Sequence, residues 1–459
     1  MHTWLLVLIL FGAVAILLLM VLKIKLHAFV ALLIVSIMTG LLAGMSPDLI
    51  IDSIQQGMGG TLGYIAVIVG LGAIFGKILE YSGGAEALAR HLLARFGERR
   101  APWAMSLAGF IIAIPVFFDV GFIILVPMLY ALSRKTGKSL LLYGIPLLAG
   151  LAATHSFIPP TPGPVAVAEI LGANLGWVIL LGFVVGIPVV ILAGPVFAKY
   201  ISKRIMVEPP EISQEAAIPG HASDESQGPY PAFRLIVMLI GCPLLLIIGN
   251  TVTGVLVGRG IMADNMLTQL IMFAGHPFSA LIIATLLALY FLGIRRGVGK
   301  KRLQELSNAS LGPAGSIILL TGAGGVLKQV LVDSGMGDQL AAAVSGSGFN
   351  PLVLAWLIAA VVRITQGSAT VAMITAAGIV SPILPVFELS QPQEALVVIA
   401  IAAGATILSH VNDSGFWLVG KYLRMDEKQT LKSWTVMETI IAVSGLVFAW
   451  LMYQAVSVL

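Results

Sequence analysis

Charged side chains are scarce in this chain, and their scarcity defines its broad class. Asp, Glu, Lys and Arg make up 10% of the 459 residues, whereas 58% are hydrophobic, and the mean hydropathy is +1.00. In soluble globular proteins about a quarter of the residues are charged. The composition therefore excludes an ordinary soluble domain and predicts a polytopic membrane protein.

Cysteine, basic leader residues and catalytic motifs are also missing or nearly so. Cys242 is the single cysteine, so no internal disulfide is possible. No basic stretch precedes the first apolar run, and its first positive charges, Lys23 and Lys25, follow it, so we expect a mature helix rather than a signal peptide. The net charge of +4 comes from short basic clusters between apolar runs, which indicate membrane orientation rather than a nucleic-acid partner.

Recognisable enzyme motifs are not found. HExxH, GxSxG and clustered metal ligands do not occur, and "TGKS" at residues 136–139 lacks a phosphate-loop glycine because Leu132 takes its position. We therefore expect no enzymatic activity, no cofactor and no metal site.

Long apolar runs of about 20 residues, the length that crosses the hydrocarbon as helix, are what the chain has instead. Ten spans are predicted, at residues 4–22, 27–44, 58–79, 140–173, 176–199, 234–257, 266–293, 311–332, 394–422 and 435–457. Two further apolar stretches, 103–132 and 351–386, are too long for one crossing and are interrupted by "FFDVG" and "RITQGSAT".

The distribution of basic residues suggests how these two stretches are placed. Cytoplasmic loops are enriched in Lys and Arg, and basic clusters at residues 90–100 and 134–138 flank the first stretch on both sides. A full crossing would put one cluster outside, so 103–132 is predicted to be a re-entrant hairpin with Asp119 near its tip. The same count makes 351–386 re-entrant from the outside, with Arg363 near its tip, and places both termini in the periplasm.

The two halves of the chain resemble each other weakly. With a shift of 252 residues, eight positions between 70 and 89 match similar residues between 322 and 341, and the later elements recur in the same order. Five spans per half would insert the second half upside down, as in many secondary transporters. We predict repeats at residues 1–204 and 232–459, joined by a polar cytoplasmic linker at 205–231.

One span in each half cannot be a continuous helix. "THSFIPPTPGP" (residues 154–164) places four prolines in mid-span, and "SHVNDSGFW" (409–417) interrupts the corresponding span. Broken backbone at membrane depth is tolerated only against protein or a wet cavity. Two hairpin tips and two breaks are therefore expected to line one site near the midplane, where helix N-termini favour an anion.

Several long motifs, in order, resemble the gluconate permease (gluconate:proton symporter) family over essentially the whole chain. They occupy residues 57–86, 114–127, 154–164, 322–335, 363–378, 409–417 and 431–440. The resemblance implies proton-coupled uptake of gluconate or a similar small hydroxy-carboxylate across a bacterial inner membrane. It also implies an elevator-type ion-transporter fold, commonly dimeric, and the family includes members for other sugar acids and for D-serine.

Charged residues are rare in membrane segments, so the few that occur there are candidates for the site. The guanidinium of Arg363 matches a substrate carboxylate, although a structural ion pair with Asp119 or Asp413 would explain it as well. Asp119 and Asp413 are candidate proton carriers, as are His410 and His155, and each histidine could equally be a hydrogen-bonded structural residue.

Uncharged candidates come from the same motifs. Their hydroxyl and amide groups suit a polyol, and their glycines suit close backbone approach, but capping of broken helices and tight packing remain alternatives. They are Thr154, Ser156, Thr161, Gly163, Gln366, Gly367, Ser368, Thr370, Asn412 and Ser414. A passive anion channel and sodium coupling are the functional alternatives to a proton symporter.

Overall fold

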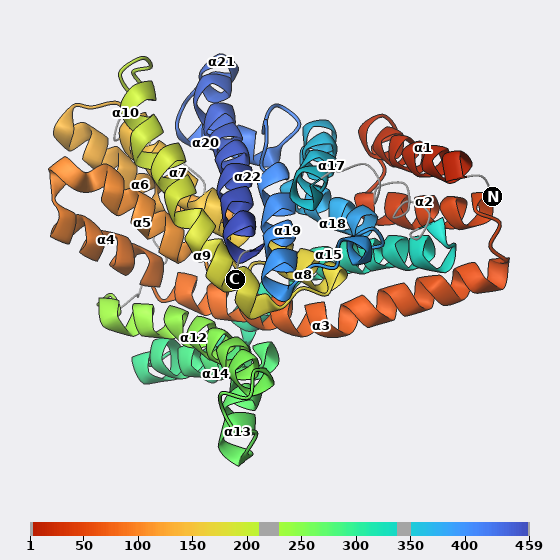
Figure 1. The fold of residues 1–459 in the computed structure, drawn as a ribbon. Coiled ribbons are helices and arrows are strands. Elements are labelled where there is room, and N and C mark those ends of the chain that lie inside the picture. The colour runs from red at the N-terminus through yellow and green to blue at the C-terminus, as the bar shows by residue number, and fades with distance from the viewer. Residues whose placement is uncertain (1–2, 211–228, 337–349, 458–459) are drawn as a thin grey trace.

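The computed structural model describes residues 3–210, 229–336 and 350–457, and it is helical throughout these ranges (Figure 1). The first part contains α1 Thr3–Leu22, α2 Ala28–Leu42, α3 Pro47–Tyr81, α4 Gly84–Phe96, η1 Glu98–Arg100, α5 Ala101–Ile112, α6 Phe118–Thr136, α7 Leu141–Phe157, α8 Pro162–Leu171, α9 Leu175–Ile191, the π-helical η2 Leu192–Val196 and α10 Phe197–Ile201. Most of the predicted linker, residues 211–228, lies outside the described ranges.

The second part is also helical. It contains α12 Phe233–Gly258, α13 Met266–Gly275, α14 Pro277–Ala288, η3 Leu289–Gly293, η4 Ile294–Arg296, α15 Lys300–Asp333, α17 Pro351–Gln366, α18 Ala369–Val380, η5 Leu384–Phe387, α19 Gln391–Gly404, α20 Ser414–Tyr422, α21 Glu427–Thr430, η6 Leu431–Thr435 and α22 Val436–Ser457. Seven helices in the described ranges are long and apolar enough to span a membrane, beginning at residues 47, 141, 175, 233, 277, 300 and 427.

A helix is interrupted at each of the four places where the sequence predicts a hairpin tip or a break. Residues 113–117 separate α5 from α6, and Gly367 and Ser368 separate α17 from α18. Residues 158–161 interrupt the first predicted broken span between α7 and α8, where prolines remove amide donors. Residues 405–413 interrupt the second between α19 and α20.

The predicted span 266–293 is wrong in its first part. The chain forms two helices there, α13 and α14, with His276 in extended conformation between them (φ −58°, ψ 136°). Pro277 causes the interruption, because its ring disfavours helical geometry in the preceding residue. The His276 side chain then caps α14 by accepting a hydrogen bond from the Phe278 amide (3.3 Å). In Figure 1, α13 and α14 run in clearly different directions.

The two longest helices, α3 and α15, pack against each other in antiparallel orientation. Ser53 donates a 2.6 Å hydrogen bond to Asp333, and Gly70, further along α3, lies nearest to Leu311 near the other end of α15. With 35 residues at about 1.5 Å each, α3 is about 50 Å long, which exceeds a hydrocarbon layer of about 30 Å. Figure 1 shows α3 extending across the molecule.

The broken spans lie inside the protein. α7 is almost entirely buried, and α19 is buried from Ala395 to Gly404, where it packs against α17, α22, α9 and α8. The first break, residues 158–161, is buried, whereas the second break is partly exposed and lines a cavity with Asn412 and Asp413. Both are places where irregular backbone is tolerated at membrane depth.

Candidate functional site

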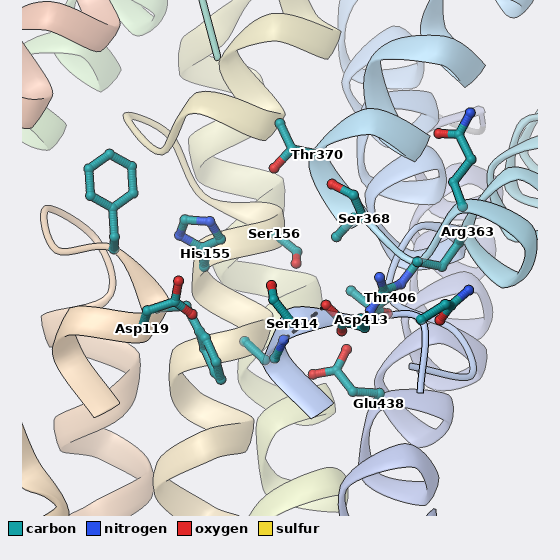
Figure 2. A pocket seen from close by; sticks show the side chains of 18 of the residues that line it. Asp119, His155, Ser156, Arg363, Ser368, Thr370, Thr406, Asp413, Ser414 and Glu438 are labelled. Atoms are coloured by element: carbon teal, nitrogen blue, oxygen red, sulfur yellow. Dashed lines mark hydrogen bonds and ion pairs between the residues drawn. The ribbon is translucent and has the colours of Figure 1, made fainter. Parts of the chain in front are cut away.

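A cavity of about 620 Å³ lies where the α5–α6 and α17–α18 connections, the end of α7 and the second break meet (Figure 2). This volume falls in the range of about 300 to 1,000 Å³ that is typical of small-molecule sites. Its lining comprises Phe117, Phe118, Asp119, Val120, Ala152, His155, Ser156, Pro313, Ile317, Arg363, Gln366, Gly367, Ser368, Ala369, Thr370, Thr406, Asn412, Asp413, Ser414, Gly415, Trp434 and Glu438. Segments as far apart in sequence as residues 117 and 438 therefore share one pocket.

The first half contributes an acid and a histidine to this pocket. Asp119 lies in the first turn of α6 and is exposed, and His155 lies in the last turn of α7. The ring of His155 meets that of Phe117 edge to face at 6.2 Å between centroids, and its buried Nδ1 has no hydrogen-bond partner in the described ranges. Figure 2 shows both side chains on the same side of the pocket, facing Ser414.

Arg363, from the last turn of α17, is a buried charge of the site. It is only 3% exposed, and its Nη2 donates a 2.6 Å hydrogen bond to Oδ2 of Asp413. Its Nε and Nη1 are buried and have no partner among the residues that the structure describes. The ion pair that the sequence left open is thus present, yet two donor nitrogens remain for an anion.

Asp413 is fixed in position by two further residues, one of which is itself held by a third. Ser409 Oγ donates to its Oδ2 at 2.5 Å, and the amide of Gly415 donates to its Oδ1 at 3.0 Å, which makes Asp413 the N-cap of α20. Ser409 itself accepts a 2.7 Å hydrogen bond from Trp434 Nε1. The pocket therefore holds Asp413 as a rigid counter-ion for Arg363.

The tip of the second hairpin is held by the break that it faces. Asn412 Nδ2 donates to the carbonyl oxygens of Ile364 (2.9 Å) and Thr365 (3.3 Å), and His410 Nε2 lies 3.1 Å from the Ile364 oxygen. These side chains satisfy carbonyls that the end of α17 leaves without helical partners. The helix ends at Gly367, whose φ of +83° is strained for any residue with a Cβ.

Four predicted residues are not among the pocket lining: Thr154, Thr161, Gly163 and His410. Thr161 Oγ1 bonds the Ile158 carbonyl at 2.7 Å, so it supports the first break instead. Gly163 permits close packing, because a Cβ there would lie 2.7 Å from the sulfur of Met373. The other predicted residues lie at the pocket, and their individual roles stay predictions.

Glu438, Thr406 and Trp434 line the pocket although the sequence did not single them out. For Glu438 a signal was available, because it is an acidic residue inside the predicted span 435–457, and intramembrane acids are functional candidates by default. Thr406 lies in an apolar stretch, where a single threonine is common in any packed helix, so nothing in the sequence marks it as a pocket residue.

Replacing Ser409 with alanine is expected to destabilise the protein by about 1 to 3 kcal/mol, because the buried Trp434 Nε1 would lose its acceptor and Asp413 a donor. The thermal midpoint of the purified protein in detergent measures this loss. Thr439→Ala is the control, because the Thr439 hydroxyl bonds only a carbonyl of its own helix. An equal midpoint for both variants would contradict the proposed rigid Asp413 network.

Together, the apolar helices and the buried polar pocket between interrupted helices define a multi-pass membrane transporter. The model of the GntP family permeases matches residues 4–456. The chain belongs to this family, which indicates a transporter rather than an enzyme.

Curated relatives match over nearly the full length. The chain is 42% identical over 457 residues to the low-affinity gluconate transporter of Escherichia coli K12, with 100% of each chain covered. It is 41% identical over 437 residues to the gluconate permease of Pseudomonas aeruginosa, with 95% of each covered.

The fold is similar to that of Neisseria gonorrhoeae MtrF, whose structure was described as illuminating a class of antimetabolite efflux pumps. The TM-score is 0.60 over 92% of this chain and 93% of that one, at 14% sequence identity. At this identity the likeness concerns the fold alone.

Proposed function

We propose that this protein imports gluconate, or a closely related small hydroxy-carboxylate, together with protons across the bacterial inner membrane. The observation that carries the proposal is the pair of unpartnered guanidinium nitrogens on buried Arg363, a residue that lines a pocket of suitable size. A guanidinium offers a planar fork of donors that matches a carboxylate. Relatives that are named gluconate transporters support gluconate as the cargo.

Hydroxyl-bearing side chains around the pocket suit the rest of such a molecule. Ser156 comes from α7, Ser368 and Thr370 from the second hairpin, and Ser414 from α20. Figure 2 shows these four side chains distributed around the cavity, with Arg363 beyond them at one end. We assign the carboxylate to Arg363 and the polyol chain to these hydroxyls.

We further propose that residues 1–204 and 232–459 are inverted repeats with re-entrant hairpins near 103–132 and 351–386. The antiparallel packing of α3 and α15, which occupy equivalent places in the two series of helices, supports an inverted relation. Residues 205–231 would then be a cytoplasmic linker, and both termini would be periplasmic. An elevator motion of the hairpins and broken helices, in a homodimer, completes this proposal.

Proton coupling sets the electrical behaviour of the cycle. Moving one elementary charge through the membrane field costs or yields about 2.3 kcal/mol per 100 mV. A monovalent anion with one proton carries no net charge, so the pH gradient alone would drive it.

Among the sequence candidates, Asp119 and His155 line the pocket without an ion pair or hydrogen bond in the described ranges, whereas Asp413 is engaged with Arg363.

Purified protein in proteoliposomes tests the proposal directly. Labelled gluconate is expected to accumulate above equilibrium under an imposed inward proton gradient, in sodium-free buffer, and a proton uncoupler is expected to abolish the accumulation. Membrane voltage at fixed pH gradient should have little effect. Uptake that only reaches equilibrium and is insensitive to the uncoupler would indicate a passive channel. Uptake that depends on sodium would indicate that sodium, and not the proton, is the coupling ion. A competing panel of sugar acids and D-serine ranks the cargo.

A further inference from the structure

Glu438 is a buried acid at the pocket with no partner to stabilise its charge. It lies in the first turn of α22, is 3% exposed, and has a buried Oε1 without a hydrogen-bond partner. Neither carboxyl oxygen makes a hydrogen bond or ion pair within residues 3–210, 229–336 and 350–457. A charge buried in this way is costly unless it is paired, so the neutral, protonated form is the less expensive state.

Its surroundings connect it to the anion site. Glu438 follows Trp434 by one helical turn, and Trp434 bonds Ser409, which bonds Asp413, the partner of Arg363. Figure 2 shows the Glu438 carboxyl group directed into the pocket, next to Asp413 and Ser414. The side chain therefore lies beside the proposed carboxylate site without belonging to its hydrogen-bond network.

Four ionisable groups from neighbouring elements share this pocket with Glu438. They are Arg363 on α17, Asp413 in the second break, Asp119 on α6 and His155 on α7. Arg363 already has a carboxylate at 2.6 Å, so its single positive charge cannot also compensate both an ionised Glu438 and an incoming anion. An ionised Glu438 would therefore compete with an incoming anion for the single guanidinium.

We infer that Glu438 binds the co-transported proton. It takes up one proton on the side from which the anion enters, stays neutral while the substrate carboxylate occupies the free nitrogens of Arg363, and releases the proton after the anion leaves on the other side. This inference rests on the proposed function. Coupling between two sites is reciprocal, so proton binding at Glu438 and anion binding at Arg363 strengthen each other.

The test uses Glu438→Gln, which mimics the neutral acid, in two proteoliposome assays. Accumulation of gluconate driven by a pH gradient is expected to fall to the equilibrium level, because no proton can be carried. Exchange of internal for external labelled gluconate at equal pH is expected to persist, because it requires no net proton movement. Gluconate affinity should fall about tenfold per pH unit in the wild type at alkaline pH and stay flat in the variant.

Two further variants complete the design. Glu86→Gln is the matched control, because Glu86 also has a buried, unpartnered carboxyl oxygen but lines a different cavity, and its accumulation should equal that of the wild type. Glu438→Asp keeps a titratable group and should restore part of the accumulation.

Persistent uphill accumulation by Glu438→Gln, or loss of exchange together with accumulation in a folded variant, would overturn the assignment. Wild-type protein that shows no proton-driven gluconate uptake at all would instead refute the proposed function, so the two failures are distinguishable.

Discussion

Alanine in place of Arg363 is expected to weaken gluconate binding by at least ~100-fold and to abolish uptake at micromolar substrate. The change removes the two donors that the proposed carboxylate would use. Two charge-assisted hydrogen bonds contribute about 3 kcal/mol or more in total, and 1.4 kcal/mol corresponds to a factor of ten in affinity. Binding to the purified protein by isothermal titration, and uptake in proteoliposomes, measure the effect.

Controls must separate binding from folding, because Arg363→Ala also leaves Asp413 without its cation. Arg363→Lys keeps a positive charge for Asp413 but loses the planar fork, so it should fold and still bind poorly. Arg259→Ala, an arginine at another cavity, should bind as the wild type does. Retained affinity in a folded Arg363→Ala protein would make the arginine purely structural.

Gly367→Ala is expected to reduce uptake by more than tenfold. A Cβ at this position would lie 2.2 Å from the carbonyl oxygen of Asn412, a distance that no packed structure tolerates. The second hairpin or the second break must therefore shift, and the shift would move Asp413, the next residue after Asn412. Initial uptake rates at equal protein content in the membrane measure the outcome.

Gly297→Ala provides a matched comparison for this substitution. Gly297 has nearly the same positive φ (+81°), but nothing lies within 4 Å of the position of its missing Cβ. Its replacement should incur only the backbone strain of about 1 to 2 kcal/mol, with uptake close to normal. Equal losses in both variants would show that strain, and not contact between the hairpin and the break, limits transport.

Local chemistry made the interruptions of the helices predictable. Prolines at 159, 160, 162 and 164 remove donors wherever they occur, and a glycine followed by a serine cap ends one helix and begins the next at residues 367–368. The same reasoning should have divided the predicted span 266–293 at Pro277. That proline was missed because the surrounding apolar run alone satisfied the length for a crossing.

Partners of the polar side chains could not be derived in this way. The motif "SHVNDSGFW" indicated a site, but its residues have different tasks in the structure. Asn412 and His410 contact carbonyls at the end of α17, some 46 to 48 residues earlier in the chain, and Asp413 pairs with Arg363. Adjacent residues in an irregular segment point in different directions, so neighbourhood in sequence does not define a common role.

The sequence by itself determined a membrane protein of this family, the four places where helices are interrupted, and the concentration of polar residues near them, because apolar length, proline and glycine act through the local backbone. Only the tertiary structure decided that Arg363 uses one nitrogen on Asp413 and keeps two free, and that Glu438 lies beside them unpaired. Such pairing depends on how α17, α20 and α22 pack around the cavity, and packing is a property of the whole chain.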